Sequence, residues 1–149
     1  MSDEEYMLEA IKEAKKAADL GEVPIGAIIT CENKIIARGF NKKESSKIAT
    51  EHAEIVAINE ACKKINDWRL SQCTIYVTVE PCLMCCGAIL QSRIKRLVYG
   101  TNNTKFGYVE SIDKTLSSSK NNHKVEITSG ILEEECRKLI QQFFKQKRN

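Results

Sequence analysis

The stretch CTIYVTVEPCLMCCGAILQS, residues 73–92, joins a strand to a helix with almost nothing between them. Residues 73–79 alternate aliphatic side chains with Thr and Tyr, which is the period of a β-strand. Pro81 follows, a residue type favoured at the start of a helix, and the run CLMCCGAILQS predicts the helix itself. This stretch therefore predicts one unit of a sheet that is covered by helices.

The residues before this stretch add two helices and a hairpin. Ser2 and Glu5 form the pattern of a capping box, ahead of an amphipathic run that ends at Gly21. The runs IGAIITC and KIIARGF, separated by the turn-prone ENK, predict a β-hairpin. Residues 41–50 read as a polar loop, and the apolar spacing of residues 52–64 predicts a second helix.

The residues after it add two strands and a final helix. RLVYG and HKVEIT predict the strands, and ILEEECRKLIQQFFKQKR, acidic at its front and basic at its back, predicts the helix. Residues 101–122 are rich in Asn, Ser and Lys and lack clear periodicity, which favours a mobile surface loop. Strands alternating with helices predict an α/β fold with a sheet between helical layers. No linker is evident, so residues 1–149 are expected to form a single domain.

Composition excludes several classes of protein. The 149 residues contain no stretch near the roughly 18 consecutive apolar residues of a membrane helix, and the acidic start MSDEEYMLEA is unlike a secretory signal. We therefore expect a cytoplasmic protein without a membrane partner. The seven cysteines are an odd number, so a disulfide framework is not expected. The net charge of +3 is too small to argue by itself for a nucleic-acid partner.

Two short motifs carry the candidate chemistry. Cys82 and Cys85 form a C-x-x-C pair in the first turn of the predicted helix, which by itself fits a redox pair, part of a zinc site or two core thiols. His52, from the segment TEHAEI, supplies a third ligand of the kind that zinc prefers. Three protein ligands leave one position open to water, as in catalytic zinc sites, and Glu54 is then a candidate proton carrier.

The spacing of His52 and Glu54 sets a geometric condition. Residues i and i+2 lie about 200° apart on a regular helix, so the two side chains cannot both point at one metal from a helix interior. Either the pair stands at the start of the helix, where the backbone leaves helical angles, or Glu54 reaches the water and not the metal. Both arrangements are compatible with a general base.

The motifs together resemble those of the zinc-dependent cytidine and adenosine deaminase superfamily, whose H-x-E and P-C-x-x-C signature is typical of enzymes that deaminate nucleobases. The similarity to its tRNA adenosine deaminases runs along the chain, through EVPIGAII, ARGFN, HAEIVAI, TIYVTVEPCLMCCGAILQSRI, LVYG and KVEITSGILEEEC. SSKIAT lacks the Asp-Pro expected before the histidine, and NNTKFGYVESIDKTL diverges. The resemblance implies a three-layer α/β/α cytidine deaminase-like fold with a central mixed sheet of about five strands.

The resemblance also implies a reaction and a set of roles. One Zn²⁺ per subunit would be held by His52, Cys82 and Cys85, with Glu54 moving protons, and adenosine would become inosine at the wobble position of a tRNA anticodon loop. A homodimer is implied as well. The expected contacts with the substrate base are Asn41, Ala53 and Pro81.

The end of the last helix offers candidate RNA contacts, Phe144, Lys145, Lys147 and Arg148, through stacking and charge. A core-facing aromatic and a solvated helix end are the simpler interpretation of some of them. Asn41 likewise fits an ordinary polar turn residue.

Other interpretations of the motifs stay open from sequence. Cys86 or His123 would close the zinc site and make it structural, although Cys86 should point away from the face that Cys85 shares with Cys82. A deaminase of a free nucleoside or base, such as cytidine, cytosine or guanine, would share every zinc residue. A non-catalytic zinc scaffold is the third possibility, and it gives no reason for Glu54.

Overall fold

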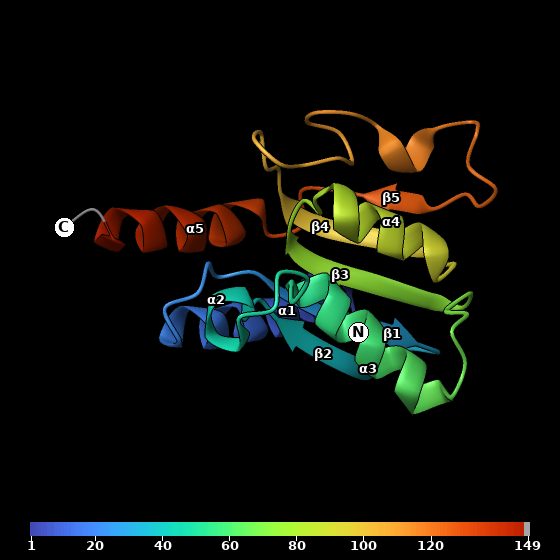
Figure 1. Cartoon of the computed structure of the whole chain (residues 1–149), viewed down its shortest axis with the longest axis horizontal. Helices are drawn as coiled ribbons and strands as arrows, with labels where there is room; N and C mark the ends of the chain where they lie inside the picture. The colour runs from blue at the N-terminus through green and yellow to red at the C-terminus, as the bar shows by residue number, and fades with distance from the viewer. Residues whose placement is uncertain (148–149) are drawn as a thin grey trace.

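A five-stranded sheet runs through the centre of the computed structural model, which describes residues 1–147 (Figure 1). The strand order is β2-β1-β3-β4-β5. β1 pairs antiparallel with both β2 and β3, whereas β3–β4 and β4–β5 are parallel, so the sheet is mixed as expected. The strands are β1 (Gly26–Cys31), β2 (Lys34–Phe40), β3 (Cys73–Val79), β4 (Arg96–Thr101) and β5 (Glu126–Thr128).

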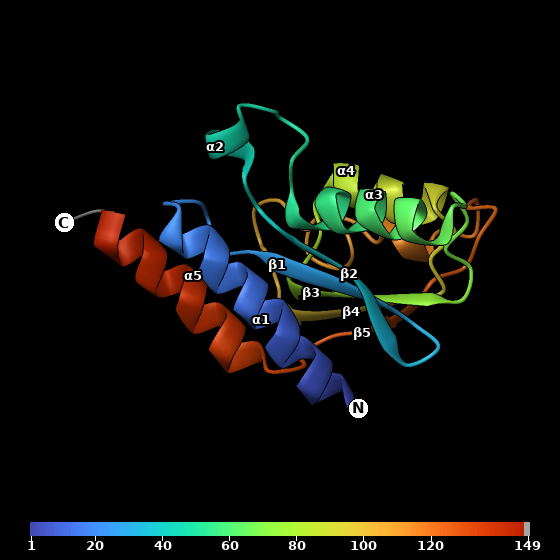
Figure 2. The ribbon, with the colours of Figure 1, turned by 90° about the horizontal axis from the view of Figure 1, so that it is seen from below.

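Helices cover both faces of the sheet and complete the predicted three-layer fold. Figure 2 shows α1 and α5 side by side on one face, with α3 and α4 on the other and the short α2 outside the layers. Each face buries its own apolar cluster. The helices are α1 (Asp3–Asp19), α2 (Lys43–Ser46), α3 (Ala53–Ile65), α4 (Leu83–Gln91) and α5 (Glu133–Lys147), with a 3₁₀ turn η1 (Thr115–Ser117).

The predicted capping box starts α1. The backbone N–H of Glu5 donates to Ser2 Oγ at 3.2 Å, and the backbone N–H of Ser2 donates to Glu5 Oε1 at 3.1 Å. The helix then packs closely on β1, because a Cβ at Gly26 would lie 2.1 Å from the carbonyl oxygen of Ala10. Only glycine permits this approach.

The predicted hairpin is formed by β1 and β2. Its two-residue turn contains Glu32 at φ 52° and Asn33 at φ 63°. Two successive positive φ values define the type I′ turn, whose twist matches that of the strands that it joins. The turn residues ENK therefore form the hairpin connection that the sequence indicated.

The stretch 73–92 places a helix start at the carboxyl end of a central strand. β3 lies between β1 and β4 in the sheet, and its residues are almost all buried. α4 begins at Leu83 and returns the chain to β4, which is parallel to β3. The carboxyl ends of β3 and β4 thus meet at the first turn of α4, the edge at which sheets of this kind hold their sites.

Two predicted loops contain more structure than their composition indicated. The segment 41–50 includes the four-residue helix α2. Residues 101–122 lack long elements, as expected, but they are not simply surface, because Val109 and Leu116 are 1% and 2% exposed in the core. The polar composition of the segment concealed these two buried apolar residues, which show no periodicity that would reveal them.

None of the helices within residues 1–147 is long and apolar enough to cross a membrane.

An ion pair ties the first turn of α1 to the sheet and makes the stability of the fold depend on pH. Asp3 accepts from Arg96 Nη1 at 3.0 Å and Nη2 at 2.7 Å, and from the Tyr76 hydroxyl at 2.9 Å. The hydrogen bonds from Arg96, more than that from Tyr76, lower the pKa of Asp3. A depressed carboxyl pKa contributes stability above the pKa of the unfolded chain, about 4, and the contribution is lost as the pH falls through the folded pKa.

Asp3→Asn is therefore expected to lower the free energy of unfolding at pH 7 by about 1 kcal/mol, a value reduced by partial exposure of the pair to water. Urea denaturation of both proteins should show this difference shrinking below about pH 4. Glu4→Gln, on the exposed side of the same turn, is the matched control and should change little. A difference that stays constant with pH would contradict the role of the ion pair.

Candidate active site

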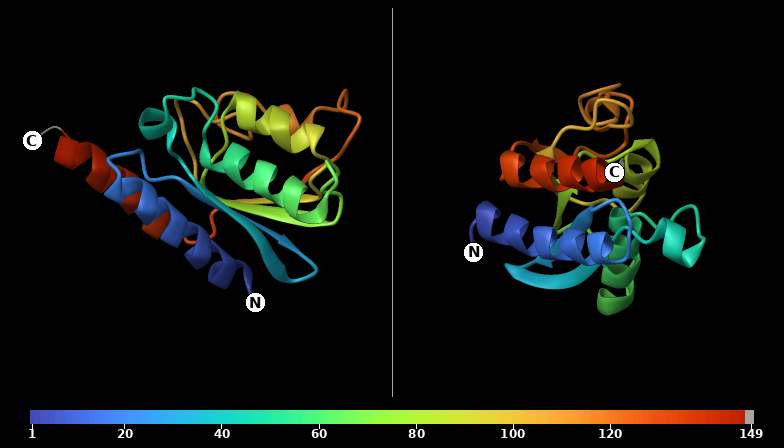
Figure 3. Two further views of the ribbon diagram at one scale, coloured as in Figure 1. Left: turned by 60° about the horizontal axis from the view of Figure 1, so that its bottom comes forward. Right: turned by 90° about the vertical axis from the view of Figure 1, so that its left-hand side faces the viewer.

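The first residues of α3 and α4 come together on one face of the sheet. His52 is the N-cap of α3 and Cys82 is the N-cap of α4, and both have extended backbones. Figure 3 shows the two helices side by side, beginning at the same end of the molecule. The ligand atoms of His52, Cys82 and Cys85 all lie within 4.8 Å of one another. The structure thus brings together the three residues that the sequence selected.

The spacing of these atoms fits a tetrahedral metal. His52 Nδ1 lies 3.6 Å from Cys82 Sγ and 3.7 Å from Cys85 Sγ. Bonds of about 2.3 Å to sulfur and about 2.0 Å to nitrogen, at tetrahedral angles, separate the ligand atoms by about 3.6 Å. One imidazole and two thiols are also the donor types that zinc favours. This group could hold a metal ion.

The geometric condition on His52 and Glu54 is met by the helix start. Because His52 has φ −76° and ψ 155°, it stands outside the helix, and α3 begins only at Ala53. Glu54 lies inside the first turn and is 4% exposed. The residues i and i+2 can therefore face one site, as the first of the two predicted arrangements requires.

The two residues that would have closed the site point elsewhere. Cys86 is buried, and its thiol donates to the carbonyl oxygen of Pro81 at 3.7 Å. His123 Nε2 lies 2.7 Å from the carbonyl oxygen of Ile94. Within residues 1–147 the one group of metal-ligating side chains contains neither of them. The donor set is therefore three, as in sites that keep an open position.

Burial and mutual contact shift the acidity of these groups. Burial is the main effect on Glu54 and raises its pKa to about 7. The charge on Cys82 also raises this pKa, and this effect is larger than the lowering by the charge on His52. Hydrogen bonding from Cys85, then from His52, lowers the pKa of the Cys82 thiol to about 4. The pKa of Cys85 is raised because it donates to Cys82 and is buried. One sulfur is thus a ready thiolate, and one carboxyl exchanges a proton near neutral pH.

The three residues predicted to contact the base have different environments. Ala53 is fully buried at the start of α3. The carbonyl oxygen of Pro81 accepts from the backbone N–H of Tyr108 at 3.0 Å. Asn41 is 9% exposed, and its amide donates to the carbonyl oxygen of Val23 at 3.3 Å, so the turn interpretation describes its present hydrogen bonds.

Two buried carboxylates that anchor neighbouring segments were not singled out from sequence. Glu22 accepts from the backbone N–H of Glu44 and from Ser45, which fixes α2 to the segment that follows α1. Glu80 is 2% exposed between β3 and Pro81. Burial raises its pKa, but hydrogen bonds from Ser111 and loop backbone groups outweigh that effect and hold the pKa at about 2. In the sequence, the signal that could have identified Glu80 is its position directly after the buried strand β3.

The predicted RNA contacts lie on the last turns of α5. Phe144 is 42% exposed, and Lys145 and Lys147 are exposed. The Lys147 ammonium lies 5.2 Å from the centre of the Phe143 ring, which is the half-buried aromatic of the pair. Arg148 lies outside the described residues.

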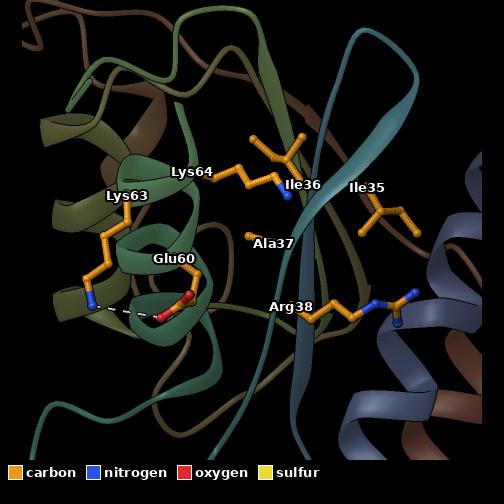
Figure 4. Close-up of a pocket in the computed structure, with 7 residues that line it drawn as sticks. All are labelled: Ile35, Ile36, Ala37, Arg38, Glu60, Lys63 and Lys64. Carbon is orange, nitrogen blue, oxygen red and sulfur yellow. Dashed lines mark ion pairs between the residues drawn. The ribbon is translucent and has the colours of Figure 1, made fainter. Parts of the chain in front are cut away.

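A hollow of about 510 Å³ lies away from the metal-ligating group, between β2 and α3. Figure 4 shows Arg38 directed from β2 toward α1, while Lys63 and Glu60 form an ion pair on α3. None of the predicted site residues lines it. The hollow is lined by Ile35, Ile36, Ala37, Arg38, Glu60, Lys63 and Lys64.

Comparisons with known proteins agree with this geometry. A family model described as MafB19-like deaminase matches residues 1–148. The tRNA-specific adenosine deaminase of Bacillus subtilis (strain 168) is 47% identical over 146 residues, which cover 98% of this chain and 91% of that protein.

Solved structures confirm the predicted fold. A structure from studies of A-to-I editing by tRNA:A34 deaminases superposes with a TM-score of 0.87 at 38% identity, over 91% of this chain and 98% of that chain. A guanine deaminase from Nitrosomonas europaea superposes with a TM-score of 0.82 at 22% identity, over 95% of this chain and 84% of that chain. The second likeness concerns the fold alone.

Cys85→Ser is expected to abolish stoichiometric binding of a divalent metal, because it removes a thiolate from a three-residue donor set. Cys86→Ser is the matched control one position away and should keep the metal, since its thiol bonds to Pro81. Elemental analysis after dialysis measures the metal content per chain of both variants. Loss of metal from Cys86→Ser, or its retention by Cys85→Ser, would contradict the assignment.

Proposed function

This chain belongs to the family of tRNA-specific adenosine deaminases, and we propose that it hydrolyses adenosine to inosine at the wobble position of a tRNA anticodon loop. The main support is near-full-length similarity to such an enzyme combined with a His/Cys/Cys group beside a buried carboxyl. The products are inosine in the RNA and ammonia, and the second substrate is water.

The proposed cofactor is one Zn²⁺ per chain, held by His52, Cys82 and Cys85. The lowered pKa of Cys82 favours the thiolate that zinc binds, and loss of the thiol proton of Cys85 would accompany binding. A zinc ion in this position supplies Lewis acidity, which lowers the pKa of water toward neutrality.

Glu54 is the proposed proton carrier. Its carboxylate accepts a proton from the attacking water and donates it to N1 of adenine while the water oxygen bonds to C6. It then transfers the second water proton to the amino nitrogen, and the C6–N bond breaks to release ammonia. A pKa near 7 suits both steps, because the group is neither a strong acid nor a strong base at neutral pH.

An anticodon loop suits a site at the start of two helices. Its unpaired bases can leave their stack at low cost, so that one base enters the pocket while the backbone stays outside. Asn41, Ala53 and Pro81 are the proposed contacts of that base. Phe144, Lys145 and Lys147, with Arg148 beyond the described residues, are the proposed contacts of the flanking RNA.

The alternatives differ in what they leave unexplained. A deaminase of free guanine has the same fold, but its likeness to this chain is only 22% identity, against 38% for the tRNA deaminase structure. A zinc scaffold would not need a carboxyl with a pKa of about 7 beside the metal ligands. Both observations favour the RNA editing enzyme.

A homodimer and a cytoplasmic location complete the proposal. The dimer rests on the family resemblance, and light scattering at several concentrations measures it. A fully active monomer would contradict it.

Wild-type protein loaded with zinc should convert an adenosine-wobble anticodon stem-loop to the inosine product, and leave free adenosine, cytidine, cytosine and guanine unchanged. Glu54→Gln should lower kcat by at least about 100-fold, the usual contribution of general acid–base catalysis, while zinc content stays at one per chain. Nuclease digestion and chromatography measure inosine, and elemental analysis measures zinc.

If the protein deaminated a free base and left the stem-loop unchanged, the assignment of an RNA substrate would be wrong, whereas the assignment of hydrolytic deamination would stand. Activity that survives Glu54→Gln would overturn the proton-carrier role. Cys86→Ser, buried beside the same helix start, serves as the control for general damage to the site.

The basic end of α5 makes a separate prediction. Lys145→Ala combined with Lys147→Ala should weaken tRNA binding and reduce the slope of log K against log salt by roughly one to two, since each lost phosphate contact releases about one counterion fewer. The matched control is Lys63→Ala with Lys64→Ala, an exposed pair at the far end of α3. Equal slopes for both double variants would contradict an RNA contact by α5.

A further inference from the structure

A single buried carboxylate organises the loop that follows β4. Glu80 is 2% exposed and accepts hydrogen bonds from residues at both ends of the segment 102–111, which are six to nine residues apart. Figure 1 shows this loop beside the start of α4. The donors are Asn102 Nδ2 at 3.1 Å, the backbone N–H groups of Asn103 at 3.0 Å, Val109 at 3.1 Å, Glu110 at 2.8 Å and Ser111 at 2.9 Å, and the Ser111 hydroxyl.

The segment Glu80–Pro81–Cys82 connects this loop to the candidate active site. The backbone N–H of Glu80 donates to the carbonyl oxygen of Thr101 at 2.8 Å, and the carbonyl oxygen of Pro81 accepts from Tyr108 at 3.0 Å. Cys82 follows immediately. The loop is therefore fixed to the residues that lead into the metal-ligating group.

The loop has a glycine where it meets this carboxylate. A Cβ at Gly107 would lie 2.3 Å from Glu80 Cδ and 2.4 Å from Oε1, so no larger residue fits without displacing one of the two. The main chain at Gly107 is thus in direct contact with the Glu80 side chain.

The residue before this glycine is the most exposed aromatic side chain among the large apolar residues of the described chain. Phe106 is 64% exposed, yet its backbone N–H donates to Asn103 Oδ1 at 3.1 Å. The ring is exposed to solvent while its backbone is fixed by a hydrogen bond. Stacking of a planar group on this ring therefore costs little conformational entropy. The partner of matching chemistry near an RNA editing site is an unpaired base.

We propose that Glu80 is a positioning residue for the RNA substrate, which fixes the 102–111 loop beside Pro81 so that Phe106 forms a stacking surface for an unpaired base next to the edited adenosine. This inference rests on the proposed function. Phe106 contacts the substrate, whereas Glu80 acts only through the loop.

The proposed roles of Phe106 and Glu80 predict that substitutions change KM and leave kcat nearly unchanged. Phe106→Ala should raise KM for the anticodon stem-loop by about tenfold with kcat little changed, because stacking on a flanking base is made equally in the bound and transition states. Trp68→Ala, an aromatic that is 53% exposed beyond the opposite end of α3, is the matched control and should leave both constants unchanged.

Glu80→Gln should reproduce the KM effect, since an amide replaces one acceptor oxygen with a donor that faces the backbone N–H groups of the loop. Hydrogen–deuterium exchange should rise in residues 103–111 of this variant, with one zinc per chain retained. Adding Phe106→Ala to Glu80→Gln should then cost little more, because the two residues act through one contact. Glu80→Asp keeps the charge and should restore part of the lost affinity.

Each outcome bears on a different part of the proposal. A normal KM in Phe106→Ala overturns the stacking role. Unchanged exchange in Glu80→Gln overturns the tether, and this measurement needs no substrate. If Glu80→Gln does not fold, Gly107→Ala disturbs the same contact from the loop side and must raise exchange in residues 103–111. A wild-type protein that edits no stem-loop overturns the proposed function, and the stacking role with it.

Discussion

The parallel pairing of β3 with β4 is the constraint on which the site depends. It requires a crossover, and α4 supplies it, so the carboxyl end of a largely buried strand leads within three residues into a helix start. α3 lies beside α4 on the same face of the sheet, and the N-caps of the two helices meet there. Two chain segments 30 residues apart thereby place an imidazole and two thiols within 4.8 Å.

The N-cap position also explains how this site works chemically. A capping residue has an extended backbone, so His52 and Cys82 point out of the helices and toward each other, whereas Glu54 and Cys85 stay within the first turns. The positive ends of two helices favour thiolates and carboxylates at this place. Burial opposes that tendency at Glu54 and brings its pKa to about 7. Opposing effects therefore give Glu54 and Cys82, which lie close together, different pKa values.

Buried carboxylates have a second use around the site, as anchors for segments without regular structure. Glu22 holds α2 and Glu80 holds the 102–111 loop, each through backbone N–H groups that loops of this kind leave unpaired. Such anchors give segments without long regular elements defined positions. Loops of this kind can vary in sequence while the side chains at the starts of α3 and α4 keep their positions.

The sequence by itself predicted a sheet between helical layers, the capping box, the hairpin and the group of His52, Cys82 and Cys85 that could hold a metal ion, because these depend on periodicity and local spacing. It did not show α2, the burial of Val109 and Leu116, or the anchoring by Glu80, because no local pattern marks a partner 22 to 31 residues away. Cys86 and His123 were likewise excluded only by where their side chains point. Tertiary structure alone decides which polar groups share one buried space, since that depends on packing between segments and not on the order of residues within them.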